Sequence, residues 1–239
     1  MNVSLLNLMN VTLFFDSFKE AFYLNFIKEN RYMLLVKGLG VTLEITFFAI
    51  ILGIVIGFII ALANLSTIKI FNVLGKIYVD VIRGTPSVVQ LLIIYYIVFA
   101  SVDIPKEIVA VMAFGINSGA YVAEIVRAGI LAVDKGQMEA GRSLGLSYAS
   151  TMRHIIIPQA IKNILPALGN EFIVLLKETA IVGYISMDDL TRGGDIIRSK
   201  TYDAFMPLIA VALVYLLITT ILSRLLGKLE RRMRQGDSR

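Results

Sequence analysis

The stretch MLLVKGLGVTLEITFFAIILGIVIGFIIALA, residues 33–63, decides the fold class of this chain. A helix that crosses the hydrocarbon core of a bilayer needs about 20 predominantly apolar residues. The stretch exceeds that length, with Lys37 and Glu44 as its only charges. Inside hydrocarbon each backbone N–H and C=O group must bond within its own segment, which a helix achieves. The stretch therefore predicts a transmembrane helix in an all-α integral membrane protein.

The composition of the whole chain supports this class. Of its 239 residues, 57% are hydrophobic and 17% are charged, whereas soluble domains hold about 25% charged residues. Cysteine is absent, which excludes disulfides and thiolate metal sites, and His154 is the only histidine. We therefore expect no metal or cofactor in this chain. The formal charge of +5 favours basic loops at an anionic inner leaflet over a nucleic-acid partner.

Four further crossings are expected at residues 87–102, 108–133, 161–185 and 205–226. An amphipathic helix at 70–82 should precede the first of them, with a break at Pro86. The segment 161–185 is the most polar, so we expect it to be buried within the helix bundle. Pro166, Gly169 and Asn170 suggest a discontinuous helix there, as in other transport paths. The alternative is a proline kink in a continuous helix.

The placement of charge predicts the topology. The loop 134–162 and the tail 224–239 are basic, which is typical of cytoplasmic segments. Five crossings then put the N terminus outside and the C terminus in the cytoplasm, with 14 of the 23 lysines and arginines inside and eight outside. The predicted parts are an extracytoplasmic amphipathic segment 1–32 without a cleavable signal, a transmembrane domain 33–226 and a basic cytoplasmic tail 227–239.

The loop at 134–158 predicts two short helices. Asp134 can cap a helix from Lys135 to Leu144, with Gln137 completing a capping box. Gly145 suits the left-handed residue that ends such a helix, and Ser147 can cap the next one. A helix this short is unstable alone, so it needs a packing partner.

The surface of the first short helix favours docking. Ala140 and Gly141 allow close backbone approach, and Met138, Leu144 and Leu146 add apolar side chains beside them. The alternative is an ordinary helical linker that lies on the inner leaflet.

The loop resembles the EAA-x3-G-x9-I-x-L-P signature of ABC importer permease subunits. The matching residues are Glu139-Ala140-Gly141, Gly145 after three further residues, and Ile155, Ile157 and Pro158. The runs YVDVIRGTPSVVQLL (78–92), AYVAEIVRAGI (120–130) and PQAIKNILPALGNEFIVLLKETA (158–180) are similar to the polar amino-acid branch of the type I importers. The resemblance covers roughly residues 35–226. This chain departs from the family pattern at Gly141, Ile157 and Ala180, where alanine, leucine and serine are common.

The resemblance implies a permease of five transmembrane helices in the bacterial cytoplasmic (inner) membrane, paired with a second copy or a homologue. Two copies of an ATP-binding subunit would bind ATP and Mg²⁺, and an extracytoplasmic substrate-binding protein would deliver the substrate. The loop 134–158 would be the coupling helix. Its implied ATPase-coupling residues are Gln137, Glu139, Ala140, Gly141 and Gly145. No G-x-x-x-x-G-K-[S/T] phosphate loop occurs in the sequence, which agrees with a transporter subunit that is not itself an enzyme.

Carboxylates within the predicted crossings point to a substrate path, because a charge in hydrocarbon costs at least about 2.5 kcal/mol. Asn117, Tyr121 and Glu124 share one helix face. This face predicts either the lining of a path or a helix–helix seam in which Glu124 pairs with Arg127 or Lys177. The candidate substrate-binding residues are Glu44, Asn117, Ser118, Tyr121, Glu124 and Lys177.

Glu44 suggests the substrate class. Its crossing offers no cation within one helical turn, so its carboxylate is free to select a cationic ligand. The alternative is a salt bridge from Glu44 to Lys177. We therefore expect transport of polar, basic L-amino acids (arginine, lysine or histidine) by alternating access. The other hypotheses are glutamine or another polar amino acid, an ion-coupled secondary transporter, and a membrane-anchored scaffold.

Overall fold

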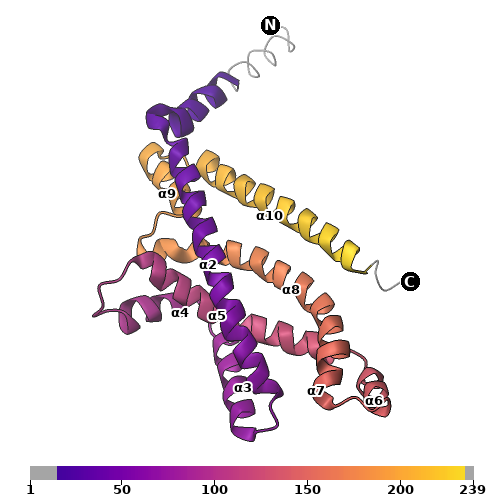
Figure 1. Ribbon diagram of the computed structural model, residues 1–239. Coiled ribbons are helices and arrows are strands. Elements are labelled where there is room, and N and C mark those ends of the chain that lie inside the picture. Colours follow the sequence, from indigo (N-terminus) through magenta and orange to yellow (C-terminus); the bar gives the residue numbers. More distant parts are fainter. Residues whose placement is uncertain (1–14, 235–239) are drawn as a thin grey trace. The chain divides into compact units, whose positions relative to one another are not determined.

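The computed structural model describes residues 15–234, and in that range it consists of helices joined by short turns and loops, with no strand (Figure 1). The all-α prediction is therefore confirmed for the described residues. After a helical stretch at 15–22, the elements are η1 (Tyr23–Ile27), η2 (Lys28–Asn30), α2 (Tyr32–Leu65), α3 (Lys69–Arg83), α4 (Ser87–Ile93), η3 (Ile94–Val98), α5 (Lys106–Leu131), α6 (Lys135–Ser143), α7 (Tyr148–Thr151), η4 (Met152–Ile156), α8 (Ile157–Glu178), η5 (Thr179–Ile185), α9 (Leu190–Thr201) and α10 (Phe205–Arg234). The predictions for residues 1–14 and 235–239 lie outside the described part of the chain.

Within residues 15–234, three helices are long and apolar enough to cross a membrane, namely α2, α5 and α10. The amphipathic helix predicted at 70–82 is confirmed as α3. It is bent by 104° from the helical segment Ser87–Val98, and the two would form a fourth crossing if they act as one. Helix α8 covers the remaining predicted crossing but is not among the helices that are apolar enough to span a membrane. Five crossings therefore stay a prediction.

Of the two alternatives for the segment 161–185, the break at Pro166 is contradicted and the continuous helix is confirmed. Helix α8 runs without interruption from Ile157 to Glu178, with Pro166 inside it. A proline removes one backbone hydrogen bond, and the helix can resume on both sides of it. The backbone changes from α-helix to 3₁₀ helix only at Thr179, where η5 begins. The Thr179 hydroxyl donates to the carbonyl of Leu176 at 2.9 Å and so satisfies one of the last carbonyls of α8.

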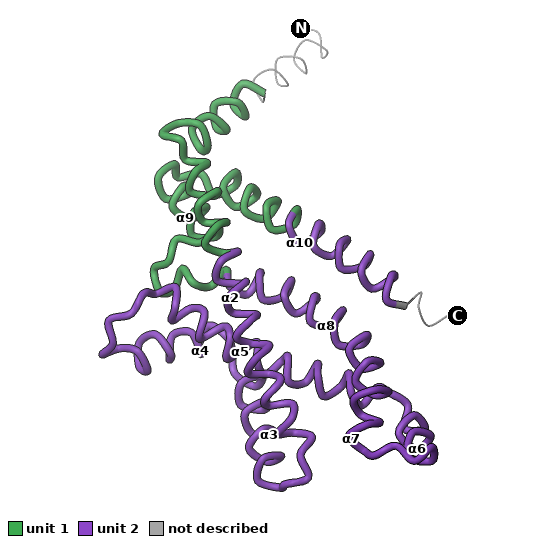
Figure 2. Tube along the Cα trace, in the orientation of Figure 1, with its two compact units in different colours: residues 1–42, 180–217 green, residues 43–179, 218–239 purple. Residues whose placement is uncertain are grey.

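The chain forms two compact units (Figure 2). Unit 1 comprises residues 1–42 and 180–217, and unit 2 comprises residues 43–179 and 218–239. In unit 1, Leu190 and Ile197 of α9 are fully buried in a core with Phe26, Leu35 and Val211. Close backbone approach fixes the start of α9, because a Cβ at Gly38 would collide with the backbone of Asp189. The packing of unit 1 therefore depends on a very close contact between α2 and the start of α9.

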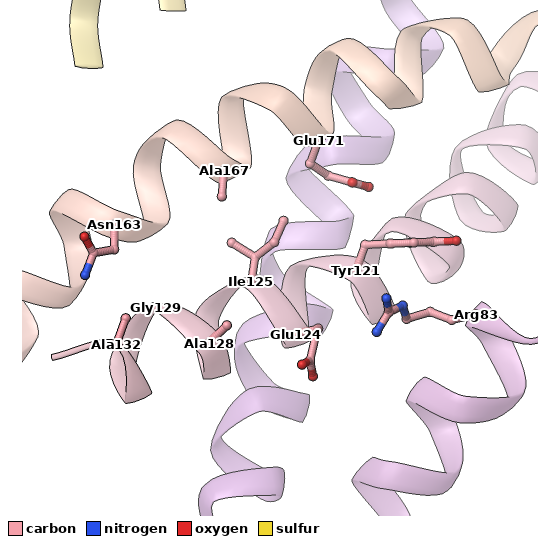
Figure 3. Close-up of a pocket in the computed structure, with 10 residues that line it drawn as sticks. All are labelled: Arg83, Tyr121, Glu124, Ile125, Ala128, Gly129, Ala132, Asn163, Ala167 and Glu171. Atoms are coloured by element: carbon pink, nitrogen blue, oxygen red, sulfur yellow. The ribbon is translucent and has the colours of Figure 1, made fainter. Parts of the chain in front are cut away.

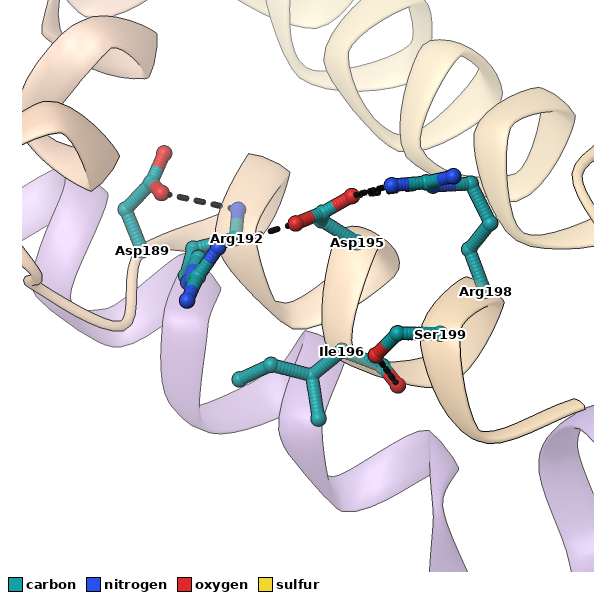
Figure 4. Close-up of polar contacts among 6 residues, drawn as sticks. All are labelled: Asp189, Arg192, Asp195, Ile196, Arg198 and Ser199. Carbon is teal, nitrogen blue, oxygen red and sulfur yellow. Dashed lines mark hydrogen bonds and ion pairs between the residues drawn. The ribbon is translucent and has the colours of Figure 1, made fainter. Parts of the chain in front are cut away.

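The polar side chains of α9 cap the start of the helix or form ion pairs with residues three positions away (Figure 4). Buried Asp189 accepts from the backbone N–H of Arg192 at 2.9 Å and of Thr191 at 3.1 Å, so it caps α9. Burial nevertheless raises the pKa of Asp189, and the backbone hydrogen bonds oppose that shift. Asp195 pairs with Arg192 and Arg198, each three residues away. The hydrogen bond from Arg198 lowers the pKa of Asp195.

In unit 2, α5 packs closely against α2 through small residues. A Cβ at Gly115 would lie 2.6 Å from Cδ2 of Leu52, and a Cβ at Gly57 would lie 2.5 Å from Cβ of Val122. Small residues allow such approach between membrane helices. Half of α5 is buried as a result, including Phe114, Val122 and Val126. The close seam with α2 leaves the polar residues of α5 to face α3, α4 and α8.

Candidate functional site

The polar part of α5 borders a cavity of about 390 Å³ in unit 2 (Figure 3). Tyr121 and Glu124 enter from α5, Asn163 and Glu171 from α8, and Arg83 from the end of α3. The remaining wall is made of small or apolar side chains, at Ile125, Ala128, Gly129, Ala132 and Ala167. The volume lies within the roughly 300–1,000 Å³ of small-molecule sites, which are mostly apolar with a few polar groups.

Glu171 is the most buried carboxylate of this cavity, with 8% of the residue exposed. The hydroxyl of fully buried Ser118 donates to its Oε1 at 2.8 Å, which holds the side chain in place. Among residues 15–234, no lysine or arginine lies within ion-pair distance of Glu171. A buried carboxylate within the bundle and without a paired cation is costly. Such a group is suited to a cationic ligand.

Of the other two charged side chains of the cavity, Glu124 is paired with a cation and Arg83 packs over an aromatic ring. Arg127 donates from Nε to Glu124 at 2.9 Å and makes a second bond through Nη2, so the two side chains form a bidentate pair. The pairing of Glu124 with Arg127, one of the two predicted alternatives, is therefore confirmed. The Arg83 guanidinium lies 5.2 Å from the centre of the Tyr121 ring, a cation–π arrangement that orients Arg83 at the cavity.

The structure divides the predicted substrate-binding residues. Tyr121 and Glu124 line the cavity, and Ser118 donates a hydrogen bond to Glu171, which also lines it. Asn117 donates instead to Oε1 of Gln90 at 2.9 Å, which makes it part of a helix–helix seam.

Glu44 and Lys177 are exposed and do not line this cavity. Within the described residues no ion pair joins Glu44 to Lys177.

Three polar residues of the cavity were not among the candidates from sequence, namely Arg83, Asn163 and Glu171. Glu171 lies within the predicted crossing 161–185, so the cost of placing a carboxylate in hydrocarbon was a usable signal. Arg83 ends α3 just before Gly84, and α3 packs on α5, where the Tyr78 hydroxyl donates to the carbonyl of Ile116 at 2.6 Å. This packing of two helices brings Arg83 to the cavity. The sequence pattern contained no sign of this approach.

The loop between α5 and α8 has the predicted caps. Helix α6 covers Lys135–Ser143, and Oδ1 of Asp134 accepts from the N–H of Gly136 at 2.7 Å. Gly145 follows with φ +83°, and Ser147 accepts from the N–H of Ser150 at 3.1 Å. The capping box is not formed as expected, because the Gln137 side chain accepts from Gln159 at 3.3 Å instead.

The packing of α6 separates an inner from an outer face. Gly141 is buried, and a Cβ there would lie 2.6 Å from Cγ2 of Thr151. Met138 packs inward against the cluster of Val133, Ile156 and Ala160, so it is not the exposed apolar side chain that the sequence suggested.

Glu139, Ala140 and Leu144 face outward, and Leu144 is 81% exposed. The helix therefore rests on α7 and η4 and presents a small, partly apolar outer face.

Residues 33–235 match the family model described as binding-protein-dependent transport system inner membrane component. The chain belongs to this family of transport permeases. The permease is 40% identical over 205 residues to the arginine transport system permease protein ArtQ of Bacillus subtilis strain 168, covering 85% of this chain and 94% of that one. It is 41% identical over 204 residues to the glutamine transport system permease protein GlnP of Escherichia coli K12, covering 84% and 93%.

Solved structures share the fold of the permease. A chain in the crystal structure of an amino acid ABC transporter with histidines is 52% identical, with a TM-score of 0.81 over 87% of this chain and 98% of that chain. A chain of the inward-facing MetNI methionine ABC transporter, 21% identical, has a TM-score of 0.72 over 84% of this chain and 96% of that chain. The permease is thus an amino-acid ABC transport permease of the inner membrane with the type I importer fold. ATP hydrolysis belongs to a separate subunit in this family.

Proposed function

We propose that this permease translocates basic L-amino acids, namely arginine, lysine or histidine, by alternating access. The proposal depends on Glu171, a buried carboxylate that Ser118 holds at the cavity and that has no paired cation in the described part of the chain. An amino acid with a cationic side chain supplies that cation. Arg83, over the Tyr121 ring, is the group that would meet the α-carboxylate of the same substrate.

The relatives support this substrate class to different degrees. The 52% identical transporter is named with histidines, and ArtQ is named for arginine. GlnP, at 41% identity, is named for glutamine, and the Asn163 amide in the cavity could hydrogen-bond a neutral side chain. Glutamine is therefore the second candidate.

The proposed assembly has this permease paired with a second copy or a homologue. Two ATP-binding subunits, which carry ATP and Mg²⁺, would dock on the outer face of α6 through Gln137, Glu139 and Ala140. Of the other two residues expected to couple to the ATPase, Gly141 is buried against Thr151 and Gly145 follows the end of the helix, so these two would set the shape of the docking element without touching the partner. An extracytoplasmic substrate-binding protein would deliver the amino acid, with the N terminus outside and the C terminus in the cytoplasm. ATP-driven closure of the ATPase pair would move the α6 helices and switch the cavity between the two sides.

The exposed candidates fit this assembly as well. Glu44 lies on a predicted crossing, and a bare carboxylate facing lipid is costly. We propose that Glu44 and Lys177 face the second permease or the path between the two copies. In that position Glu44 would keep the charge-selecting role expected from the sequence.

Glu171→Gln tests the substrate class in the complete transporter reconstituted in liposomes. Loss of a hydrogen-bonded charge is worth about 1.5–3 kcal/mol, so half-maximal arginine stimulation of ATP hydrolysis should need roughly 10- to 150-fold more arginine. The response to glutamine should change little. Glu107→Gln, the same substitution at an exposed position outside the cavity, is the matched control. An equal loss for arginine and glutamine would reject basic selectivity, and uptake that follows an ion gradient without ATP would reject the ABC mechanism.

A further inference from the structure

The N-terminal part of unit 1 holds a second cavity, of about 250 Å³, that the transport proposal does not use. Its wall includes Lys28 and Arg31 from one segment and Lys200, Thr201 and Asp203 from another. The first segment precedes residue 33, where the family match begins. The cavity is therefore built partly from sequence outside that match.

The buried side-chain amide of Asn25 joins the two segments of the cavity wall by hydrogen bonds. Asn25, 1% exposed, donates to Oδ2 of Asp203 at 2.7 Å and accepts from the hydroxyl of Thr201 at 2.9 Å. These bonds join residues 176 and 178 positions apart in the chain. Glu29 and Asn30 then take positive φ angles of 58° and 52°. Two successive non-glycine residues in this region are strained, and such strain gathers at functional positions.

The cavity has a surplus of positive charge. Both oxygens of Asp203 are engaged, one by Asn25 and the other by the backbone N–H of Phe205 at 2.9 Å. Arg31 bonds the carbonyl of Leu24 at 2.9 Å and pairs with Glu29 at 3.2 Å, yet its buried Nε has no acceptor among the described residues. Lys28 and Lys200 are exposed and, in the same part of the chain, have no ion pair. An anion at this cavity would balance these charges.

The surroundings place the cavity at a membrane boundary. Arg31 directly precedes α2, and Asp203 lies two residues before α10, so the cavity sits where two apolar helices begin. Beside it Phe22, Tyr23 and Ile27 are 46%, 55% and 47% exposed. Aromatic side chains and the charged ends of lysine and arginine are enriched at the level of lipid headgroups.

We propose that Lys28, Arg31 and Lys200 form a binding site for the phosphate of an anionic phospholipid headgroup. The lysines supply point charges, and the guanidinium supplies directed donors to phosphate oxygens. The lipid tails would lie along the exposed apolar side chains of the same segment. The site would tie the N-terminal segment to the membrane at the start of α2.

The test uses the complete transporter, purified with its ATP-binding subunit. Short-chain phosphatidylglycerol should raise its unfolding temperature at lower concentrations than phosphatidylcholine or inorganic phosphate does. Each lysine near an anionic lipid favours binding about fivefold, so Lys28→Gln with Lys200→Gln should weaken the phosphatidylglycerol effect about 25-fold. Lys19→Gln, the same change at an exposed site in the same segment but outside the cavity, should leave it unchanged.

Several outcomes would overturn the site. Equal stabilisation by phosphatidylglycerol and phosphatidylcholine would show no headgroup selection. If inorganic phosphate alone raised the unfolding temperature as much as phosphatidylglycerol does, the cavity would be a site for a free anion. An unchanged lipid effect in the double variant, with weaker stimulation of ATP hydrolysis by the substrate-binding protein, would assign the lysines to protein docking.

Discussion

Gly141 shows what a single side chain decides in the coupling loop. The family pattern commonly has alanine at this position, and local sequence does not explain the change to glycine. In the structure the position faces Thr151, with no room for a Cβ at the present separation. Glycine therefore sets how closely α6 approaches α7.

Gly141→Ala should destabilise the chain by about 1–3 kcal/mol, the usual cost of overpacking, measured by thermal unfolding of the purified complex. Thr151→Ala removes the opposing methyl group, so the double variant should recover part of that loss. Ala140→Ser, at the exposed neighbouring position, is the control and should have little effect. If the two substitutions are additive, Gly141 and Thr151 do not limit the packing.

At the scale of elements, α9 depends on its cap. Asp189 is fully buried and accepts two backbone N–H bonds, and the adjacent backbone leaves Gly38 no space for a side chain. The start of α9 is thus fixed both by hydrogen bonds and by contact with α2.

Asp189→Ala should lower the free energy of unfolding by about 1–2 kcal/mol, because two N–H groups lose their acceptor. Asp189→Asn keeps an acceptor and loses a charge whose pKa burial already raises, so most of the stability should remain. Chemical denaturation of both variants separates the two effects. Similar losses in both would mean that the charge, and not the cap, stabilises α9.

At the scale of the whole molecule, the outer face of α6 should transmit movement from the ATPase. Leu144 is 81% exposed, so Leu144→Asp should leave the unfolding temperature of the isolated permease within a few degrees of wild type. Co-purification of the ATP-binding subunit and transport should both fall at least tenfold, because a charge would enter an apolar contact. Lys135→Gln, exposed at the start of the same helix, serves as control. Unchanged association would place the coupling surface elsewhere.

The sequence by itself determined the membrane class, the caps at Asp134, Gly145 and Ser147, and the family through its signature residues. These features depend on local composition and on spacing within one turn or one segment, which can be read along the chain.

Only the tertiary structure decided which polar side chains meet at the cavity. Asn117 and Glu124 share a face of α5, yet Asn117 donates to Gln90 whereas Glu124 lines the cavity. Ser118 and Glu171, 53 positions apart, became one hydrogen-bonded pair. Such meetings depend on how α3, α5 and α8 pack, because contact between distant residues is set by packing geometry and has no counterpart in local sequence periodicity.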